Sequence, residues 1–338
     1  MDHKTIIRDI KKRIFYPVYF LAGEEPFYID KISNILMEYV LDDTQKEFNQ
    51  SILYGKETHL DEVLSTAKRY PMMAEHHLVI VKEAQHLKKE ITNKNSKLLS
   101  YLENPVKSTI LVFCYKDKKP RMNTKVGKMI KSNAVFFESP KIYEYKIPQW
   151  IEEYIQETEL KADPKVCTLL AEHLGNDLQR IANEIDKLQI ILSKGEDITP
   201  EIIEKNVGIS KEYNIFELQN AISYKNNKKA QMIVDHFSKN PNEHAFPRYV
   251  SIFYSYLTRL LLYKELANKK DRKELAAELK IHPFFLKEYS AASNNHSKKK
   301  VTKLISELKN YDLKSKGVNN NSSTDGELMK EYVQKFLE

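Results

Sequence analysis

The residue that most invites a chemical interpretation is Gly23, which follows a strand-like apolar run and precedes a helix-like segment. The first glycine of a phosphate-binding loop has this position, because amides at the start of the next helix bind anions. Tyr28, Ile29 and Asp30 then stand where such a loop has glycine, lysine and serine or threonine. Isoleucine cannot neutralise phosphate, Asp30 would repel it, and Pro26 removes an amide donor. The segment predicts either a degenerate phosphate loop without nucleotide or a plain strand–turn–helix.

The spacing of the glycines excludes both common nucleotide-binding motifs. The eight glycines lie at positions 23, 55, 127, 175, 195, 208, 317 and 326, and the closest two are nine residues apart. A phosphate loop requires two glycines five residues apart, and a dinucleotide-binding loop requires three within six positions. Neither motif can therefore be present.

The other reactive residue types are scattered along the chain. Cys114 and Cys167 are too few for a disulfide framework or an all-cysteine zinc site, and we interpret them as buried small hydrophobic residues. His76 and His77 are adjacent, so in a strand they would point to opposite faces and could not chelate one metal ion. We therefore predict no catalytic constellation, no metal site and no cofactor.

The composition is that of a globular protein with more than one domain. A chain of 338 residues is too long for one ordinary core, and its content of 41% hydrophobic and 30% charged residues is typical of folded proteins. No apolar run approaches the roughly 20 residues of a membrane span, and the N-terminal segment lacks the apolar centre of a secretory signal. We therefore expect a cytoplasmic protein without membrane contact.

The charge is mildly basic. The 54 basic and 47 acidic residues leave a net charge of +7, and the part from Lys264 onward holds 16 basic and 11 acidic residues. This excess permits contact with nucleic acid, although a dedicated DNA-binding domain usually has a stronger bias. Lys298, Lys299 and Lys300 are candidates for contacts with DNA phosphates; the alternative is a solvated helical surface.

The segments that would position these residues alternate in type over the first 140 residues. Short apolar runs, most of them rich in β-branched or aromatic residues, occur at 18–21, 51–54, 78–81, 109–113 and 134–137. Segments with apolar residues at helical spacing lie between several of these runs, as at Ile32, Ile35 and Leu36. Continuous apolar runs are typical of strands covered on both faces of a parallel sheet. We therefore predict an α/β domain with crossover connections at residues 1–140.

Helical periodicity dominates after Pro140. Leu178, Ile181, Ile185 and Leu188 share one face of a predicted helix, and a long segment rich in tyrosine and leucine spans 246–266. We predict two all-α domains, a small one at 141–210 and a larger one at 211–338.

Several segments, taken in order, resemble the delta subunits of bacterial DNA polymerase III. They cover nearly the whole chain and lie at 18–27, 62–64, 70–73, 78–87, 175–188, 214–222, 229–230 and 312–317. The resemblance implies a degenerate AAA+ module with a RecA-like parallel sheet, followed by a helical lid domain and a helical collar domain used in oligomerisation. It also implies that the loop at Gly23 has decayed and that the chain has no catalytic site of its own.

The resemblance further implies partners and a binding element. Delta subunits belong to the loader that places a ring-shaped sliding clamp on primed DNA, in a hetero-oligomeric ring with ATPase subunits and delta-prime. Two exposed apolar residues after the second predicted helix enter a pocket of the clamp, and Met72 and Met73, after Pro71, match them. The family often has a Leu-Phe-like pair there, so the two methionines are a departure, although flexible thioethers suit an irregular pocket. The alternative is that this pair covers the edge of the sheet.

Two other classes of function stay open. An active AAA+-type ATPase that acts on nucleic acid would need the phosphate-binding lysine that Ile29 replaces. A helical scaffold protein outside replication would need neither a clamp nor loader subunits as partners.

Overall fold

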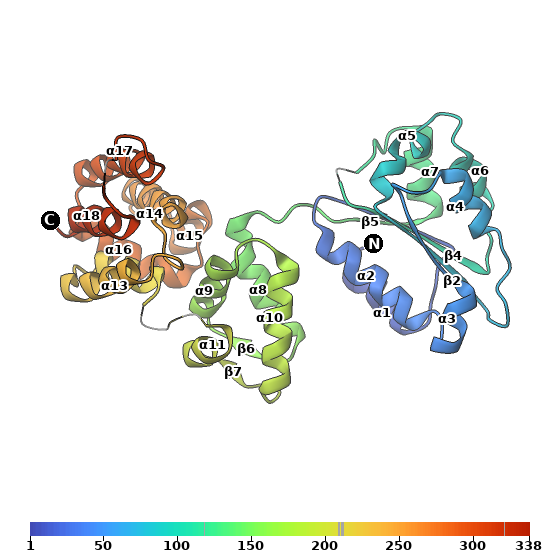
Figure 1. Ribbon diagram of the computed structural model, residues 1–338, viewed down its shortest axis with the longest axis horizontal. Helices are drawn as coiled ribbons and strands as arrows, with labels where there is room; N and C mark the ends of the chain where they lie inside the picture. The colour runs from blue at the N-terminus through green and yellow to red at the C-terminus, as the bar shows by residue number, and fades with distance from the viewer. Residues whose placement is uncertain (118, 209, 211–212, 321) are drawn as a thin grey trace. The chain divides into compact units, whose positions relative to one another are not determined.

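The computed structural model describes residues 1–117, 119–208, 210, 213–320 and 322–338. The chain forms two compact units, residues 1–142 and 143–338, which are described separately (Figure 1).

The first unit is built on five parallel strands. They are β1 (Val18–Ala22), β2 (Gln50–Tyr54), β3 (His77–Lys82), β4 (Thr109–Tyr115) and β5 (Val135–Glu138). The order in the sheet is β2-β3-β4-β1-β5, and every neighbouring pair is parallel. All five predicted strands are confirmed. The continuous apolar runs of β1, β3 and β4 mark strands that are covered on both faces, whereas the edge strand β2 is only partly buried.

Helices cover both faces of this sheet (Figure 1). One face carries α1 (His3–Lys11) and α2 (Pro26–Tyr39); the other carries α4 (Leu60–Ala67), η1 (Ala84–Leu87), α5 (Lys88–Ile91), α6 (Lys97–Glu103) and α7 (Lys125–Asn133). The short helix α3 (Asp43–Asn49) leads directly into the edge strand β2. The predicted α/β class is confirmed, whereas α1 and α3 were not predicted because each is short and mostly polar.

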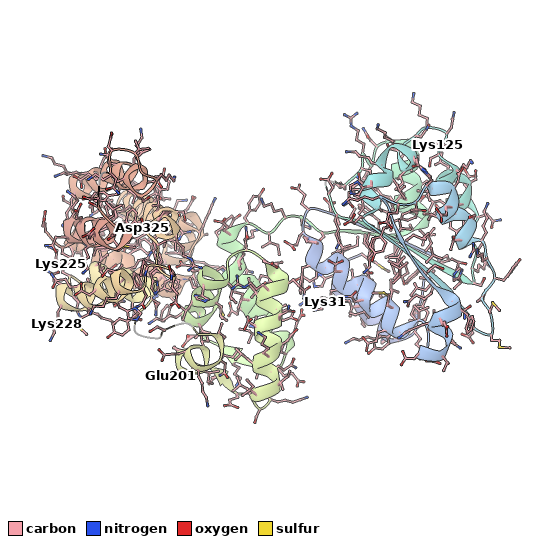
Figure 2. The ribbon with its side chains drawn as sticks, in the orientation of Figure 1. Lys31, Lys125, Glu201, Lys225, Lys228 and Asp325 are labelled. Carbon is pink, nitrogen blue, oxygen red and sulfur yellow. The ribbon has the colours of Figure 1, made fainter. Side chains whose placement is uncertain are left out.

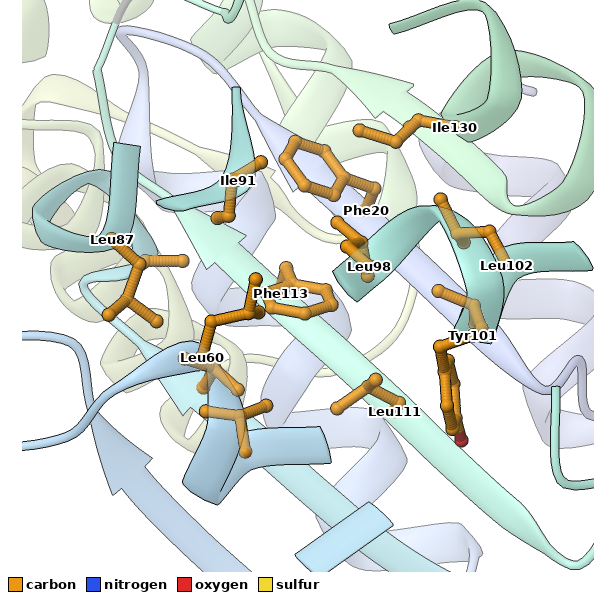
Figure 3. Close-up of a cluster of buried hydrophobic side chains, with 14 of the residues drawn as sticks. Phe20, Leu60, Leu87, Ile91, Leu98, Tyr101, Leu102, Leu111, Phe113 and Ile130 are labelled. Carbon is orange, nitrogen blue, oxygen red and sulfur yellow. The ribbon is translucent and has the colours of Figure 1, made fainter. Parts of the chain in front are cut away.

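The core forms on both sides of the sheet because successive strand residues point to opposite faces. Phe20 of β1 and Phe113 of β4 lie opposite each other in register and pack toward α6 and α7 (Figure 3). The next residues, Leu21 and Cys114, pack toward α1 and α2 instead. Each strand therefore contributes to two hydrophobic clusters.

Gly23 has a structural role at the end of β1. Its amide donates to the Tyr115 carbonyl at 3.1 Å, and the Ser139 amide donates to the Ala22 carbonyl at 2.8 Å. These two bonds bring the backbone of Ser139 so close that a Cβ at position 23 would lie 1.9 Å from the Ser139 carbonyl oxygen. Sheet packing alone thus requires glycine here.

The second unit is helical. Its long elements are α8 (Ile147–Glu157), α9 (Pro164–Leu174), α10 (Leu178–Ile191), α11 (Pro200–Val207), α12 (Ile215–Ser223), α13 (Asn227–Lys239), α14 (Phe246–Leu266), α15 (Arg272–Leu279), α16 (Leu286–Asn295), α17 (Lys298–Ser315) and α18 (Asp325–Leu337). The short turns η2 (Glu144–Lys146) and η3 (Pro283–Phe285) accompany them. No helix among the described residues is long and apolar enough to cross a membrane.

The predicted helical character of this part is confirmed with one small addition. The two-residue strands β6 (Lys161–Ala162) and β7 (Asp197–Ile198) pair in parallel and join two loops. Strands this short leave no readable periodicity. The domain boundary predicted between residues 210 and 211 adjoins positions 209, 211 and 212, which lie outside the described residues. The division into lid and collar domains stays a prediction.

We expect Gly23→Ala to destabilise the protein by about 3 kcal/mol, because the new methyl group must displace the backbone of Ser139, which directly follows β5. The matched control is Gly195→Ala, since Gly195 also has a positive φ, of 81°, but open space around its Cβ position. That change should cost only about 1 kcal/mol of backbone strain. Urea denaturation followed by circular dichroism measures both, and equal costs would contradict this role of Gly23.

Candidate binding segment and the phosphate-loop position

The start of α2, where a phosphate loop would bind its ligand, holds a carboxylate of the protein itself. Glu25 is the N-cap residue, and its side chain accepts a hydrogen bond from the Phe27 amide at 3.1 Å. Pro26 occupies the first helical position and has no amide hydrogen. The positive end of the helix, which attracts anions in nucleotide-binding proteins, is therefore already capped by a negative charge.

The three positions that a phosphate loop needs have other structural roles. Ile29 is completely buried in the cluster beneath α1 and α2. The Tyr28 ring packs on His3, with 4.0 Å between ring centroids. The Asp30 carboxylate pairs with the Lys116 ammonium, which follows β4, at 2.7 Å. The geometry of these residues suits a stable strand–helix joint, and the absence of nucleotide binding stays a prediction.

Residues 70–76, here called the methionine segment, connect α4 to β3. Met72 is 63% exposed and the Met73 side chain is fully exposed, with Tyr70 exposed beside them and Pro71 partly buried. Ala74 packs against the core beneath α1 and α2, and so fixes the end of the segment nearer to β3. The structure thus presents both methionines to solvent. If the pair served only to cover the edge of the sheet, this exposure would not be needed.

The methionine segment and the phosphate-loop position lie at opposite edges of the sheet. Gly23 follows β1, at the carboxyl edge where parallel sheets bind nucleotides. The methionine segment precedes β3, at the amino edge. A partner on the segment therefore does not require the loop at Gly23 to hold a ligand.

Asn49, the last residue of α3, holds the segment in place. Its carboxamide accepts a hydrogen bond from the Met72 amide at 2.6 Å and donates one to the Met72 carbonyl at 2.9 Å. Sequence reasoning missed Asn49 because its partner lies 23 residues away and no local pattern connects them.

The three candidate DNA-contacting lysines differ in their surroundings. Lys298 pairs with Glu265 of α14. The Lys300 ammonium donates to the Phe336 carbonyl near the end of α18 at 2.7 Å, and burial, with a smaller repulsion from Lys225, lowers the pKa of Lys300. Lys299 is exposed. Two of the three thus have partners within the chain, and the DNA contact stays a prediction.

The surface near Lys300 carries further positive charge. Lys225, whose charge acts on Lys300, precedes α13, and Lys228 lies in the first turn of that helix; both are exposed and project outward (Figure 2).

The second unit contains a cavity of about 1130 Å³ that the sequence did not predict. Five acidic residues line it, among them Glu172 from α9 and Glu288 from α16. Burial raises the pKa of Glu172 to about 8 and that of Glu288 to about 7, although Arg259 of α14 partly opposes the rise at Glu172. The Oε2 atom of Glu172 has no hydrogen-bond partner among the described residues.

The two cysteines and the adjacent histidines His76 and His77 have ordinary structural surroundings. Both Cys114 and Cys167 are buried, and burial raises their thiol pKa values to about 11 and about 12. Within the described part of the chain, no three histidine, cysteine or acidic side chains are grouped as metal ligands would be. His77 is buried in β3 and approaches the Ser51 hydroxyl of β2, while His76 packs edge-on against Phe15.

Comparison with known proteins finds a matching family and similar individual proteins. A family model described as DNA polymerase III, delta subunit, matches residues 19–139, and a model of the C-terminal domain of that subunit matches residues 212–330. DNA polymerase III subunit delta of Bacillus subtilis is 28% identical over 321 residues, which cover 91% of this chain and 90% of the relative. The solved structure of the Bacillus subtilis DNA clamp loader delta protein has a TM-score of 0.58 at 23% identity and covers 99% of both chains. This likeness confirms the predicted fold class.

We expect Mg-ATP to show no saturable binding up to about 1 mM, because Glu25 caps the helix and Ile29 offers no charge to phosphate. Isothermal titration calorimetry measures this, with Mg²⁺ alone as the control. A saturable isotherm would contradict our interpretation of the loop.

We also expect the second unit to lose stability as the pH rises from about 4.5 to 8. The folded form keeps Glu172 protonated up to about pH 8, whereas the unfolded form ionises near its ordinary value of 4.5, so a rising pH favours unfolding. Glu172→Gln should remove the part of this loss that Glu172 causes, which for a pKa rise of this size is up to about 4 kcal/mol.

Fluorescence of Trp150, the single tryptophan, reports on the second unit during urea denaturation at pH 5 and pH 8. Glu201→Gln is the control, because Glu201 is exposed on α11 (Figure 2). An equally steep pH dependence in wild type and Glu172→Gln would show that Glu172 is not the group responsible.

Proposed function

Because the chain belongs to the family of DNA polymerase III delta subunits, we propose that it works in clamp loading during DNA replication: it binds the sliding clamp through the methionine segment and favours the open clamp. The observation that carries this proposal is the exposure of Met72 and Met73. Moving two adjacent exposed apolar side chains from water into a partner's pocket lowers the free energy, and so favours binding.

The methionine pair has the properties of an anchor. Methionine is unbranched and polarizable, so it adapts to an irregular apolar pocket, and a few such residues usually carry most of the binding energy of an interface. Tyr70, exposed in the same segment, adds an amphipathic ring that suits the rim of an interface.

Opening the clamp needs differential affinity and no bond chemistry. A subunit that binds the open clamp more tightly than the closed one shifts the population toward the open form by the ratio of the two affinities. The chain contributes no catalytic residue to this step in our proposal. Nucleotide acts on other loader subunits, whose rearrangement exposes or covers the methionine segment.

The second unit has the role of the assembling part in this proposal. Its helices pack with ATPase subunits and delta-prime in a hetero-oligomeric ring, and primer–template DNA is contacted through the assembled complex. Lys299 is the residue of the three lysines best placed for phosphate, because Lys298 and Lys300 already have partners. The work takes place in the cytoplasm, with the replicating DNA.

We expect the double variant Met72→Ala, Met73→Ala to bind the clamp at least about 30-fold more weakly, the loss of about 2 kcal/mol that marks an interface hot spot. Its thermal unfolding should match wild type, because neither side chain packs in the core. Calorimetry with the clamp of the same organism measures the affinity.

The matched control is Ile190→Ala, Ile191→Ala, a second adjacent apolar pair that is 86% and 59% exposed at the end of α10. It removes a similar apolar surface elsewhere and should leave clamp affinity unchanged. Unchanged affinity of the methionine variant, or equal losses in both variants, would contradict the assignment of the methionine segment.

A further inference from the structure

We propose that Asn49 is the positioning residue of the clamp contact: its carboxamide holds the methionine segment in the conformation in which Met72 and Met73 are presented. This inference rests on the proposed function and adds a residue outside the segment that determines how well the segment binds.

The Asn49 side chain hydrogen-bonds to both backbone polar groups of Met72, its amide and its carbonyl. Asn49 Oδ1 accepts from the Met72 amide at 2.6 Å, and Asn49 Nδ2 donates to the Met72 carbonyl at 2.9 Å. The second hydrogen of Nδ2 donates to the Gln45 carbonyl, one turn earlier in α3, at 3.1 Å. The carboxamide thus holds Met72 as a neighbouring strand would, and is itself fixed by its own helix.

Only a carboxamide of this length meets these demands. The site needs one acceptor and two donors on the same short side chain, which asparagine has and aspartate, serine and leucine lack. Asn49 is 1% exposed, so its geometry is fixed by packing as well as by the bonds. It also directly precedes β2, so the segment is tied to a rigid strand of the sheet.

The bonds to Met72 explain how an exposed segment keeps a defined shape. Met73 has a φ of 53°, a left-handed conformation that is unfavourable for a residue with a Cβ. Both neighbours of Met73 are held in place. Asn49 holds Met72 by hydrogen bonds, and Ala74 packs against the core. A segment ordered before docking does not lose that conformational entropy when it binds, so its affinity is higher.

The first test needs no clamp. In Asn49→Ala the Met72 amide loses its acceptor, and we expect its hydrogen exchange to become at least about tenfold faster in the free protein. Asn133→Ala is the matched control, because Asn133 also donates from its Nδ2 to a distant backbone carbonyl, that of Leu102, at 2.9 Å. It lies at the end of α7, and its loss should leave Met72 exchange unchanged. Unchanged exchange in Asn49→Ala would overturn the proposal.

The second test measures clamp affinity in four proteins: wild type, Asn49→Ala, the double methionine variant, and the combination of all three substitutions. We expect Asn49→Ala to weaken binding about tenfold in the wild-type background, as for the loss of two ordering hydrogen bonds, and to have no further effect once the methionines are gone. A residue that only stabilises the fold would weaken binding equally in both backgrounds.

The outcomes separate this inference from the proposed function. If the double methionine variant loses affinity and Asn49→Ala does not, or if the effects simply add, the inference on Asn49 is wrong and the proposed function stands. If the double methionine variant keeps full affinity, the proposed clamp contact fails, and the role of Asn49 in it fails as well.

A conservative variant keeps the test decisive if Asn49→Ala does not fold. Asn49→Asp has the same shape and retains an acceptor for the Met72 amide, but it loses the donors to the Met72 and Gln45 carbonyls. We expect the Met72 amide to exchange faster and the clamp to bind more weakly than in wild type, but by less than if all the bonds of Asn49 were lost. Wild-type values for both would overturn the proposal.

Discussion

The structure of the first unit depends on burying both faces of one parallel sheet. Parallel strands require crossover connections, so helices must return across the sheet and cover it. Each crossover then leaves a connection at the amino edge before the next strand. The methionine segment is such a connection, between α4 and β3, and its place follows from the topology. A rigid sheet that supports an exposed loop is a common arrangement for a binding site.

The same sheet would support nucleotide chemistry at its carboxyl edge, but the residues there have other roles. Glu25 caps α2, Ile29 belongs to the core, and Asp30 neutralises Lys116. Gly23 is retained for a reason unrelated to phosphate, the close approach of the Ser139 backbone. The two edges are therefore independent of each other: the carboxyl edge is occupied by the protein's own side chains, while the connection at the amino edge exposes apolar residues to solvent.

The second unit is stabilised by a different balance. Its helices leave Glu172 and Glu288 beside a cavity, where burial favours their protonated forms. Lys300 is likewise used within the fold, as a donor to the last turn of α18. Residues of charged types can thus lie inside a helical unit instead of on its solvated surface. A count of charges along the chain does not reveal which of them are buried or have partners within the fold.

The amino-acid sequence alone determined the five strands, the change to helices after residue 140 and the exclusion of nucleotide motifs, because hydrophobic periodicity and glycine spacing are local properties. It also pointed to Met72 and Met73, through the resemblance of ordered segments to a known family. Only the tertiary structure decided what holds and surrounds these residues. Asn49 lies 23 residues from Met72, and Lys300 lies 36 residues from Phe336. Such contacts depend on how distant elements pack, and no period in the sequence records them.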